Sequence, residues 1–174
     1  MSVDYSIKLR RKSDDKVLAE FYANILKNIL DSEYSDMIHC EGRNADNAKF
    51  DVNDLNALSD KVFDKIISLK DEIYHKDQMI PKSKNVEVMH EIEDQIACLK
   101  EEIIELKWVL YSADALHGII SCLTEDLIKQ GRSAYVYNGK DLPKKKAKDY
   151  NGNEYDAAQY IWVNDVYCEI KASW

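Results

Sequence analysis

The spacing of hydrophobic positions changes along this chain, and each spacing predicts a different element. Residues 3–10 alternate between apolar and polar side chains, which is the pattern of a half-buried β-strand. Over residues 17–30, apolar pairs recur every four positions, and Ser13 before two aspartates suits the start of a helix. We therefore predict an N-terminal strand and a first helix that ends near Asp31, with residues 32–49 as loop.

A second helix has clear signals at both ends. Asp51 can cap its N-terminus, Asp54 occupies the third helical position, and Phe50 with Leu55 can form a hydrophobic staple. Pro81 ends the pattern. Between these signals one apolar row runs at spacings of three or four, apart from one missing step: Leu55, Leu58, Val62, Ile66, Leu69, Ile73 and Ile80.

The third predicted helix is the longest and carries a heptad pattern. It runs from Val86 to about Gln130, where Gly131 supplies a C-terminal cap. The a positions are Met89, Ile96, Ile103, Leu110, His117 and Thr124, and the d positions are Ile92, Leu99, Leu106, Ala113, Ile120 and Leu127. Beyond Leu106 apolar residues spread around the whole helix, which predicts that this half is buried.

The apolar rows of the second and third helices match in an antiparallel register. Facing residues then have numbers that sum to 165: Ile73 with Ile92, Leu69 with Ile96, Ile66 with Leu99, Val62 with Ile103, and Leu55 with Leu110. This match favours an intramolecular helical hairpin over a parallel homodimeric coiled coil.

The C-terminal residues have β signals, including two Asn-Gly turns and many tyrosines. We predict a strand over residues 133–137 and a terminal hairpin in which residues 160–163 pair with residues 166–171. With the N-terminal strand, these segments predict a short sheet formed by both chain ends.

Together these patterns predict an α+β fold that is mostly α, in one domain of residues 1–174. A long antiparallel, coiled-coil-like helical hairpin, residues 51–107, projects as an arm. The base, residues 1–50 and 108–174, consists of helices packed on a short antiparallel sheet formed by both chain ends.

Composition narrows the class of protein. The 174 residues carry a net charge of −8, which argues against direct nucleic-acid binding and permits a partner with a basic surface. No apolar run has the length of a membrane span or the pattern of a signal peptide, so we expect a cytoplasmic protein with no membrane partner. The four cysteines form no C-x-x-C pair, and neither a zinc knuckle nor a disulfide framework is indicated.

No motif fixes a reaction. Two Glu-x-x-His units end at His75 and His90, but the carboxylate and imidazole of the second, Glu87 and His90, fall away from the helical seam. His117 has Asp114 one turn before it, an arrangement that more often holds a core histidine than a catalytic one. We therefore predict a protein that is not an enzyme and has neither metal nor cofactor.

The acidic third helix is the principal candidate surface. Residues 85–130 hold ten Asp or Glu against three Lys. We predict a protein–protein interaction module that acts through this surface, with self-association as a further possibility. Small size, acidity and a lysine-rich, arginine-poor bias fit a phage- or mobile-element-encoded inhibitor of a host protein. The predicted partner-binding residues are Glu91, Asp94, Glu101, Glu102 and Glu105.

A basic island near the C-terminus predicts a different function. Lysines beside tyrosines can hold a phosphate and stack a base, although no arginine is present there for a bidentate grip. The alternative function is therefore binding of a small phosphorylated or nucleotide ligand. Its predicted residues are Lys144, Lys145, Lys146, Tyr150 and Tyr155.

Overall fold

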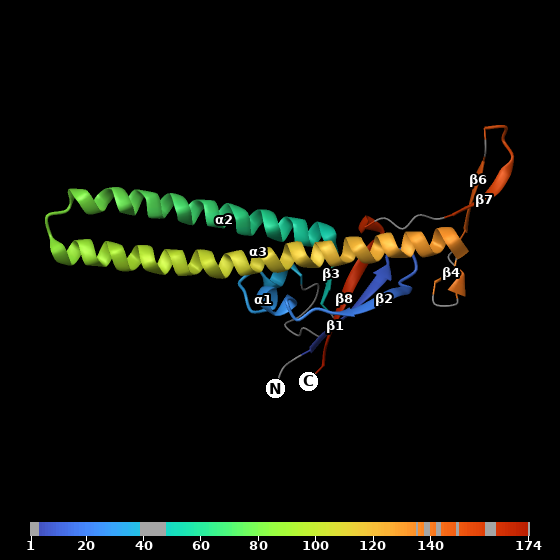
Figure 1. The fold of residues 1–174 in the computed structure, drawn as a ribbon, viewed down its shortest axis with the longest axis horizontal. Helices are drawn as coiled ribbons and strands as arrows, with labels where there is room; N and C mark the ends of the chain where they lie inside the picture. Colours follow the sequence, from blue (N-terminus) through green and yellow to red (C-terminus); the bar gives the residue numbers. More distant parts are fainter. Residues whose placement is uncertain are drawn as a thin grey trace.

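The protein is mostly helical, and two long helices pack together beside a four-stranded antiparallel sheet (Figure 1). The computed structural model describes residues 4–38, 48–134, 136–137, 140–141, 144–148, 150–158 and 163–173. Helix α2 (Val52–Met79) leads through a 3-10 turn, η2 (Ile80–Lys82), into α3 (Val86–Ala134). Over this part of the chain, no helix is both long and apolar enough to cross a membrane.

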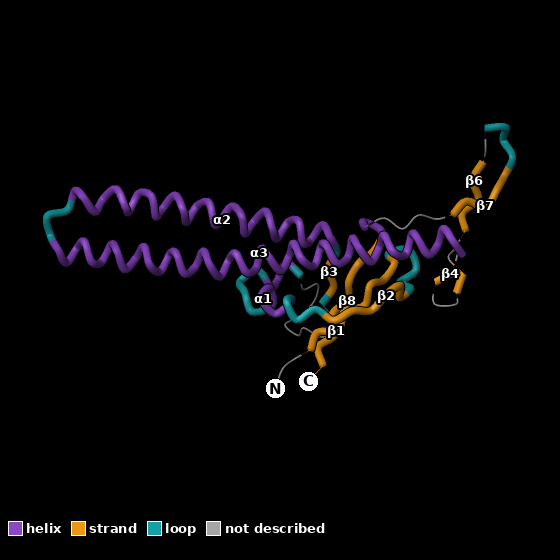
Figure 2. Tube along the Cα trace, in the orientation of Figure 1, coloured by secondary structure: helices purple, strands orange, loops and turns teal. Residues whose placement is uncertain are grey.

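The sheet brings together strands that are far apart in the sequence (Figure 2). Its order is β2 (Val17–Tyr22), β1 (Asp4–Arg11), β8 (Val166–Ser173) and β3 (Lys49–Phe50). Strand β1 is central and pairs antiparallel with both neighbours, so that Ile7 lies opposite Phe21 on one side and Ile170 on the other. One long helix, α3, extends over the sheet.

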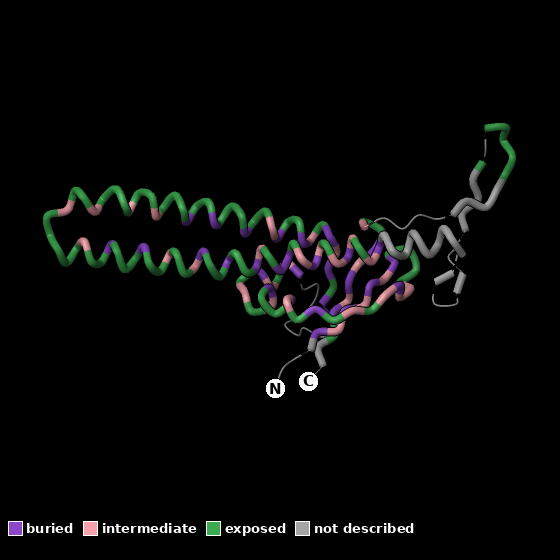
Figure 3. The backbone as a smooth tube through the Cα atoms, in the orientation of Figure 1, coloured by how far each residue is buried: buried purple, intermediate pink, exposed green. Residues whose placement is uncertain are grey.

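The core lies where the long helices and the short α1 (Leu26–Leu30) meet the sheet (Figure 3). Further from the sheet, buried positions form one row on each long helix, and most of the other positions are exposed. Removal of this apolar surface from water is the main stabilising contribution. The fully buried side chains include Ile7, Leu9, Leu18, Leu26, Ile29, Phe50, Leu55, Leu58, Leu116, Ile120 and Ile170.

Both long helices begin with side-chain caps, and the cap of α2 is the one that the sequence predicts. The amide of Asp54 donates to Asp51 Oδ1 at 2.9 Å, and the amide of Asp51 donates to Asp54 Oδ2 at 2.9 Å, which is a complete capping box. At the start of α3, Asn85 Oδ1 accepts from the amide of Glu87 at 2.9 Å. The prediction of α2 from its local signals is confirmed at both ends.

The predicted first helix is wrong. Residues 17–22 form strand β2, and only Leu26–Leu30 are helical. A tight turn joins β1 to β2, with the amide of Arg11 donating to Lys16 O at 2.9 Å and Asp15 at a φ of 57°. The non-local pairing with β1 outweighs the helical spacing, because a central strand needs partners on both edges.

The C-terminal part also differs from the prediction. Gly131 lies inside α3 and does not cap it, so the strand expected from residue 133 is reduced to β4 (Val136–Tyr137), which pairs with β5 (Lys140–Asp141). Residues 163–165 form a 3-10 turn, η3 (Val163–Asp165), and residues 160–162 of the predicted hairpin lie outside the described residues. Within the predicted loop 32–49, residues 35–37 form a 3-10 turn, η1 (Ser35–Met37).

Tyr167 of β8 provides a test of this arrangement at high pH. Its Oη donates to Asp15 Oδ1 at 2.7 Å, and burial together with the Asp15 carboxylate raises the pKa of Tyr167 to about 12. Because this pKa exceeds the unfolded value near 10, the protonated Tyr167 contributes its full stabilisation of the folded state below about pH 10. This contribution is lost as the pH rises toward 12. We expect the urea midpoint to fall over this window, and Tyr167→Phe to make the fall shallower.

The matched control is Tyr150→Phe, since Tyr150 is fully exposed. It should leave the pH dependence of the urea midpoint as in the wild type. An unchanged slope for Tyr167→Phe would show that the bond to Asp15 does not contribute to stability.

Candidate functional site

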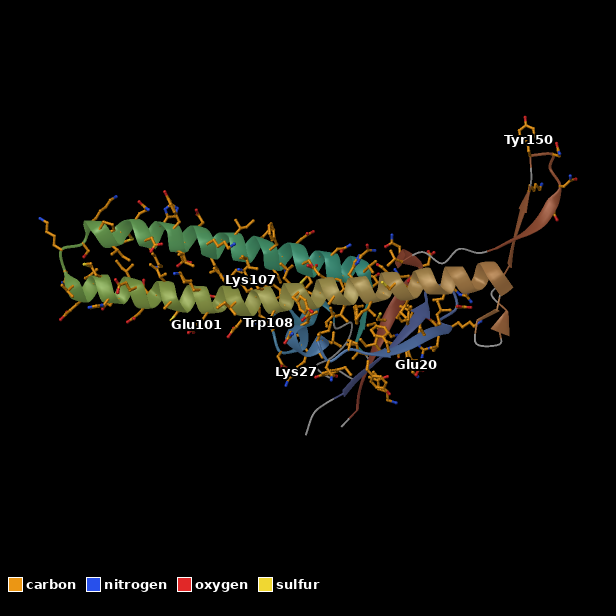
Figure 4. The ribbon with its side chains drawn as sticks, viewed as in Figure 1. Glu20, Lys27, Glu101, Lys107, Trp108 and Tyr150 are labelled. Atoms are coloured by element: carbon orange, nitrogen blue, oxygen red, sulfur yellow. The ribbon has the colours of Figure 1, made fainter. Side chains whose placement is uncertain are left out.

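The five carboxylates predicted to bind a partner lie on one side of α3, and they form what we call the acidic face: Glu91, Asp94, Glu101, Glu102 and Glu105. With about 100° of rotation per residue, they fall within an arc of about 100° around the helix axis. Four of them are exposed and Glu102 is half-buried. Lys100 and Lys107 lie on the other side of the helix. In Figure 4, Glu101 lies on the edge of α3 that points away from α2, whereas Lys107 lies toward α2.

The acidic face continues onto the base through a groove between α3 and the segment that follows α1. We call this the α1–α3 groove; it has a volume of about 630 Å³. Glu102 and Glu105 line it from α3, and Asp31 and Glu33 line it from the base. The described residues that line it include no lysine or arginine. Four negative charges therefore face one space with no opposing charge in its lining.

Tyr34 shows that these charges converge. Burial is the largest cause of its raised pKa, and the carboxylates of Glu33 and Glu102 raise it further. Glu33 and Glu102 belong to segments that are far apart in the sequence, and both line the groove together with Tyr34. Such a field attracts cations and repels anions.

A hydrogen bond joins α1 to α3 beside the α1–α3 groove. Asn28 Nδ2 donates to Ser112 Oγ at 2.9 Å, and Ser112 Oγ in turn donates to Trp108 O at 2.9 Å. This chain of hydrogen bonds fixes α1 against α3.

An exposed aromatic side chain borders the α1–α3 groove. Trp108 is 57% exposed, and its ring contacts Tyr111 edge to face with centroids 6.0 Å apart. The sequence pattern predicted burial for this half of α3; Val109 and Leu116 are buried as expected, but Trp108 and Tyr111 are not. An indole beside carboxylates can stack on a guanidinium while the carboxylates accept its hydrogen bonds.

A second groove, about 460 Å³, lies between α2 and α3. Asp94 and Glu102 line it from α3, and Glu72 lines it from α2. Lys76 also lines it, and its Nζ donates to Gln95 Oε1 at 2.8 Å. Because Glu102 lines both grooves, the acidic face forms one continuous surface from the helix pair to the base.

The residues of the alternative ligand site fall largely outside the described side chains. Lys144, Lys145 and Lys146 lie on β6 (Lys144–Lys148), which pairs antiparallel with β7 (Glu154–Ala158), the strand that contains Tyr155. The register places Lys146 opposite Asp156. Tyr150 lies in the turn between these strands and is fully exposed (Figure 4).

The histidines predicted to lie on solvated helix faces do so. His75 Nε2 lies 3.5 Å from Asp71, and His90 Nδ1 lies 3.5 Å from Glu93, in contacts within single helices. His117 is half-buried, with Nδ1 3.5 Å from Ser121 Oγ. Among the residues whose placement is described, no three His, Cys, Asp or Glu side chains are grouped so that they could hold a metal ion.

No family model, curated protein or solved structure matches this chain. The features of the chain that bear on function are therefore the acidic face and the α1–α3 groove. Sequence reasoning found the five carboxylates of α3 but missed Asp31, Glu33 and Trp108. Asp31 and Glu33 join the site only through the packing of α1 on α3, whereas Trp108 lies in the half of α3 that the pattern predicted to be buried.

Proposed function

We propose that this protein is a cytoplasmic, non-enzymatic interaction module in which α2 and α3 form an intramolecular, coiled-coil-like hairpin that projects from the base. Three observations support the hairpin: the short connection through η2, the Lys76–Gln95 hydrogen bond, and the rows of buried residues on both helices. The antiparallel pairing of β1 with β8 supports a base in which both chain ends share one sheet.

The hairpin presents the acidic face to a basic surface of another protein. The observation that carries this proposal is the continuity of the five carboxylates on α3 with Asp31 and Glu33, which line the α1–α3 groove together with Glu102 and Glu105. Among the described residues, the lining of that groove includes no lysine or arginine. Long-range attraction accelerates association with a basic surface, and the exposed Trp108 beside the charges adds apolar contact area. If that basic surface is the one through which the partner functions, the module inhibits the partner by covering it.

Charge reversal on the acidic face tests the function. The probe is a fluorescein-labelled peptide of twelve residues in which arginines alternate with leucines, titrated with the full chain at low and at physiological salt. For the triple variant Glu101→Lys, Glu102→Lys, Glu105→Lys we expect binding at least about tenfold weaker, with the loss shrinking as salt rises. The three lysines of the variant then repel the arginines of the peptide, whereas the three glutamates of the wild type attract them.

A matched variant controls for net charge. Asp60, Asp64 and Asp71 are exposed on α2, on the side away from α3, and their replacement by lysine changes the net charge by the same amount. This control should weaken binding by less than about threefold. Equal losses in the two triple variants would show that only net charge matters, and would reject the acidic face as the binding surface.

A further inference from the structure

A second surface of the helix pair is apolar, exposed and separate from the acidic face. Phe63 is 53% exposed, Ile67 is 50% exposed and Ile104 is 56% exposed. Isolated apolar residues are normal on a protein surface, but a continuous exposed row usually marks an interaction site. Tyr74 and Tyr111 extend the row along the two helices.

These side chains share one broad face of the helix pair. We call the apolar residues of each long helix that face the other helix its inner row. Phe63 directly follows Val62, and Ile104 directly follows Ile103; Val62 and Ile103 are buried residues of the inner rows. One step along a helix is a rotation of about 100°. Because the two helices run in opposite directions, this step turns both rows toward the same side of the pair. Ile67, Tyr74 and Tyr111 follow the inner-row positions 66, 73 and 110 in the same way.

The charges on this face differ from those of the rest of the chain. Lys70, Lys100 and Lys107 also directly follow inner-row positions and are exposed, as is Glu93. The face is therefore locally basic in a protein whose net charge is −8. We name it the apolar–lysine face; it consists of Phe63, Ile67, Tyr74, Ile104 and Tyr111 with Lys70, Lys100, Lys107 and Glu93.

We propose that a second copy of this chain packs on the apolar–lysine face, with a two-fold axis parallel to the helices, to form a four-helix bundle. In this arrangement α2 of each copy lies over α3 of the other at the same height. Phe63 and Ile104 have numbers that sum to 167, close to the register of 165, so each Phe63 meets Ile104 of the second copy. Lys70 and Glu93 sum to 163, so each lysine meets a carboxylate of the second copy.

The two Lys70–Glu93 pairs across the two-fold favour a second copy as the occupant. The two-fold places no lysine of the face opposite another lysine. In the register of 165, Lys100 lies at the height of residue 65 of α2, where α2 contributes Ile67 to this side. Lys107 lies at the height of residue 58, where α2 contributes Ser59. The face is about 27 Å long from Glu93 to Tyr111 and two helices wide, so the dimer buries roughly 1,100 Å² in total, which is just below the range of standard stable interfaces and suits a dimer that dissociates on dilution. The acidic face lies on the opposite side of α3 and stays free.

Sedimentation velocity of the full chain over about 1 to 100 µM tests the proposal. We expect twice the monomer mass at the upper concentrations. Ile104→Glu and, on the other helix, Phe63→Glu should each weaken dimerisation at least about tenfold with the helical circular dichroism unchanged. Met79→Glu is the matched control, because Met79 is 55% exposed but does not lie on this face.

A charge swap tests the orientation. Lys70→Glu should weaken the dimer by placing two carboxylates together, and adding Glu93→Lys should restore it. A wild type that is monomeric at every concentration, a dimer that survives both glutamate substitutions, or a swap that fails to restore the dimer would each overturn the proposal. None of these outcomes depends on the acidic face, so failure of the dimer and failure of the proposed function are separate results.

Discussion

Phe50→Ala is expected to lower the free energy of unfolding by about 3 to 5 kcal/mol, since truncation of a buried phenylalanine loses its transfer free energy and leaves a cavity. Phe50 is 1% exposed and lies on β3, the edge strand that pairs with β8 and leads directly into α2. Its ring belongs to the same core cluster as Leu55 of α2. One side chain therefore links the sheet to the start of the helix pair. Urea unfolding followed by circular dichroism measures the loss.

Tyr150→Ala is the control for this truncation. It removes an aromatic ring of similar size from a fully exposed position in the turn between β6 and β7. We expect a change of less than about 0.5 kcal/mol. If Phe50→Ala and Tyr150→Ala cost the same, Phe50 would not be part of the core that joins the sheet to α2.

The start of α2 was predictable because all of its signals are local. The Asp51 cap, Asp54 at the third position and the Phe50–Leu55 staple lie within six consecutive residues. The long apolar rows also made it predictable that the protein is mostly helical and that long helices pack together. Their spacing extends over many turns, so a few irregular positions do not obscure it.

The segment over residues 17–30 was not predictable from its own spacing. Its apolar pairs fit a helix, yet residues 17–22 pair with β1, a strand that β8 borders on its other edge. The turn that permits this pairing depends on Asp14, whose carboxylate accepts from Arg11 Nε at 2.9 Å. The sequence pattern instead predicted that Asp14 lies at the start of a helix. Tertiary pairing decided between two locally acceptable structures.

The residues of the candidate site were also only partly predictable from the sequence. Heptad positions showed that Glu101 and Glu105 lie away from the inner row, so their exposure followed from the sequence. The contribution of Asp31 and Glu33 did not, since it depends on how the five-residue helix α1 packs on α3 through Asn28 and Ser112. A short helix with no side-chain cap has little local signal to fix its place.

Asp51→Ala is expected to lower the free energy of unfolding by about 2 kcal/mol, because it removes two interactions at once. Asp51 Oδ1 accepts from the Asp54 amide at 2.9 Å, and Oδ2 accepts from Lys12 Nζ at 2.8 Å. Loss of a cap costs about 1 kcal/mol or more, and a partly exposed ion pair adds at most about 1 kcal/mol. Thermal and urea unfolding at neutral pH measure the total.

Two variants separate these contributions. Asp51→Ser keeps an oxygen that can cap α2 and loses the charge, whereas Lys12→Met keeps the cap and removes only the ion pair. We expect each to cost less than half of the loss in Asp51→Ala. If Asp51→Ser costs as much as Asp51→Ala, the ion pair and not the cap stabilises the start of α2.

The pH dependence gives an independent check on the same carboxylate. Burial alone would raise the pKa of Asp51, but the hydrogen bonds from Lys12 and the Asp54 amide outweigh burial, and the pKa is lowered. Its contribution is therefore present above the unfolded pKa and is lost as the pH falls through the folded pKa. The stability difference between wild type and Asp51→Ala should shrink below about pH 4. A difference that stays constant into acid would show that the charged form of Asp51 is not the stabilising one.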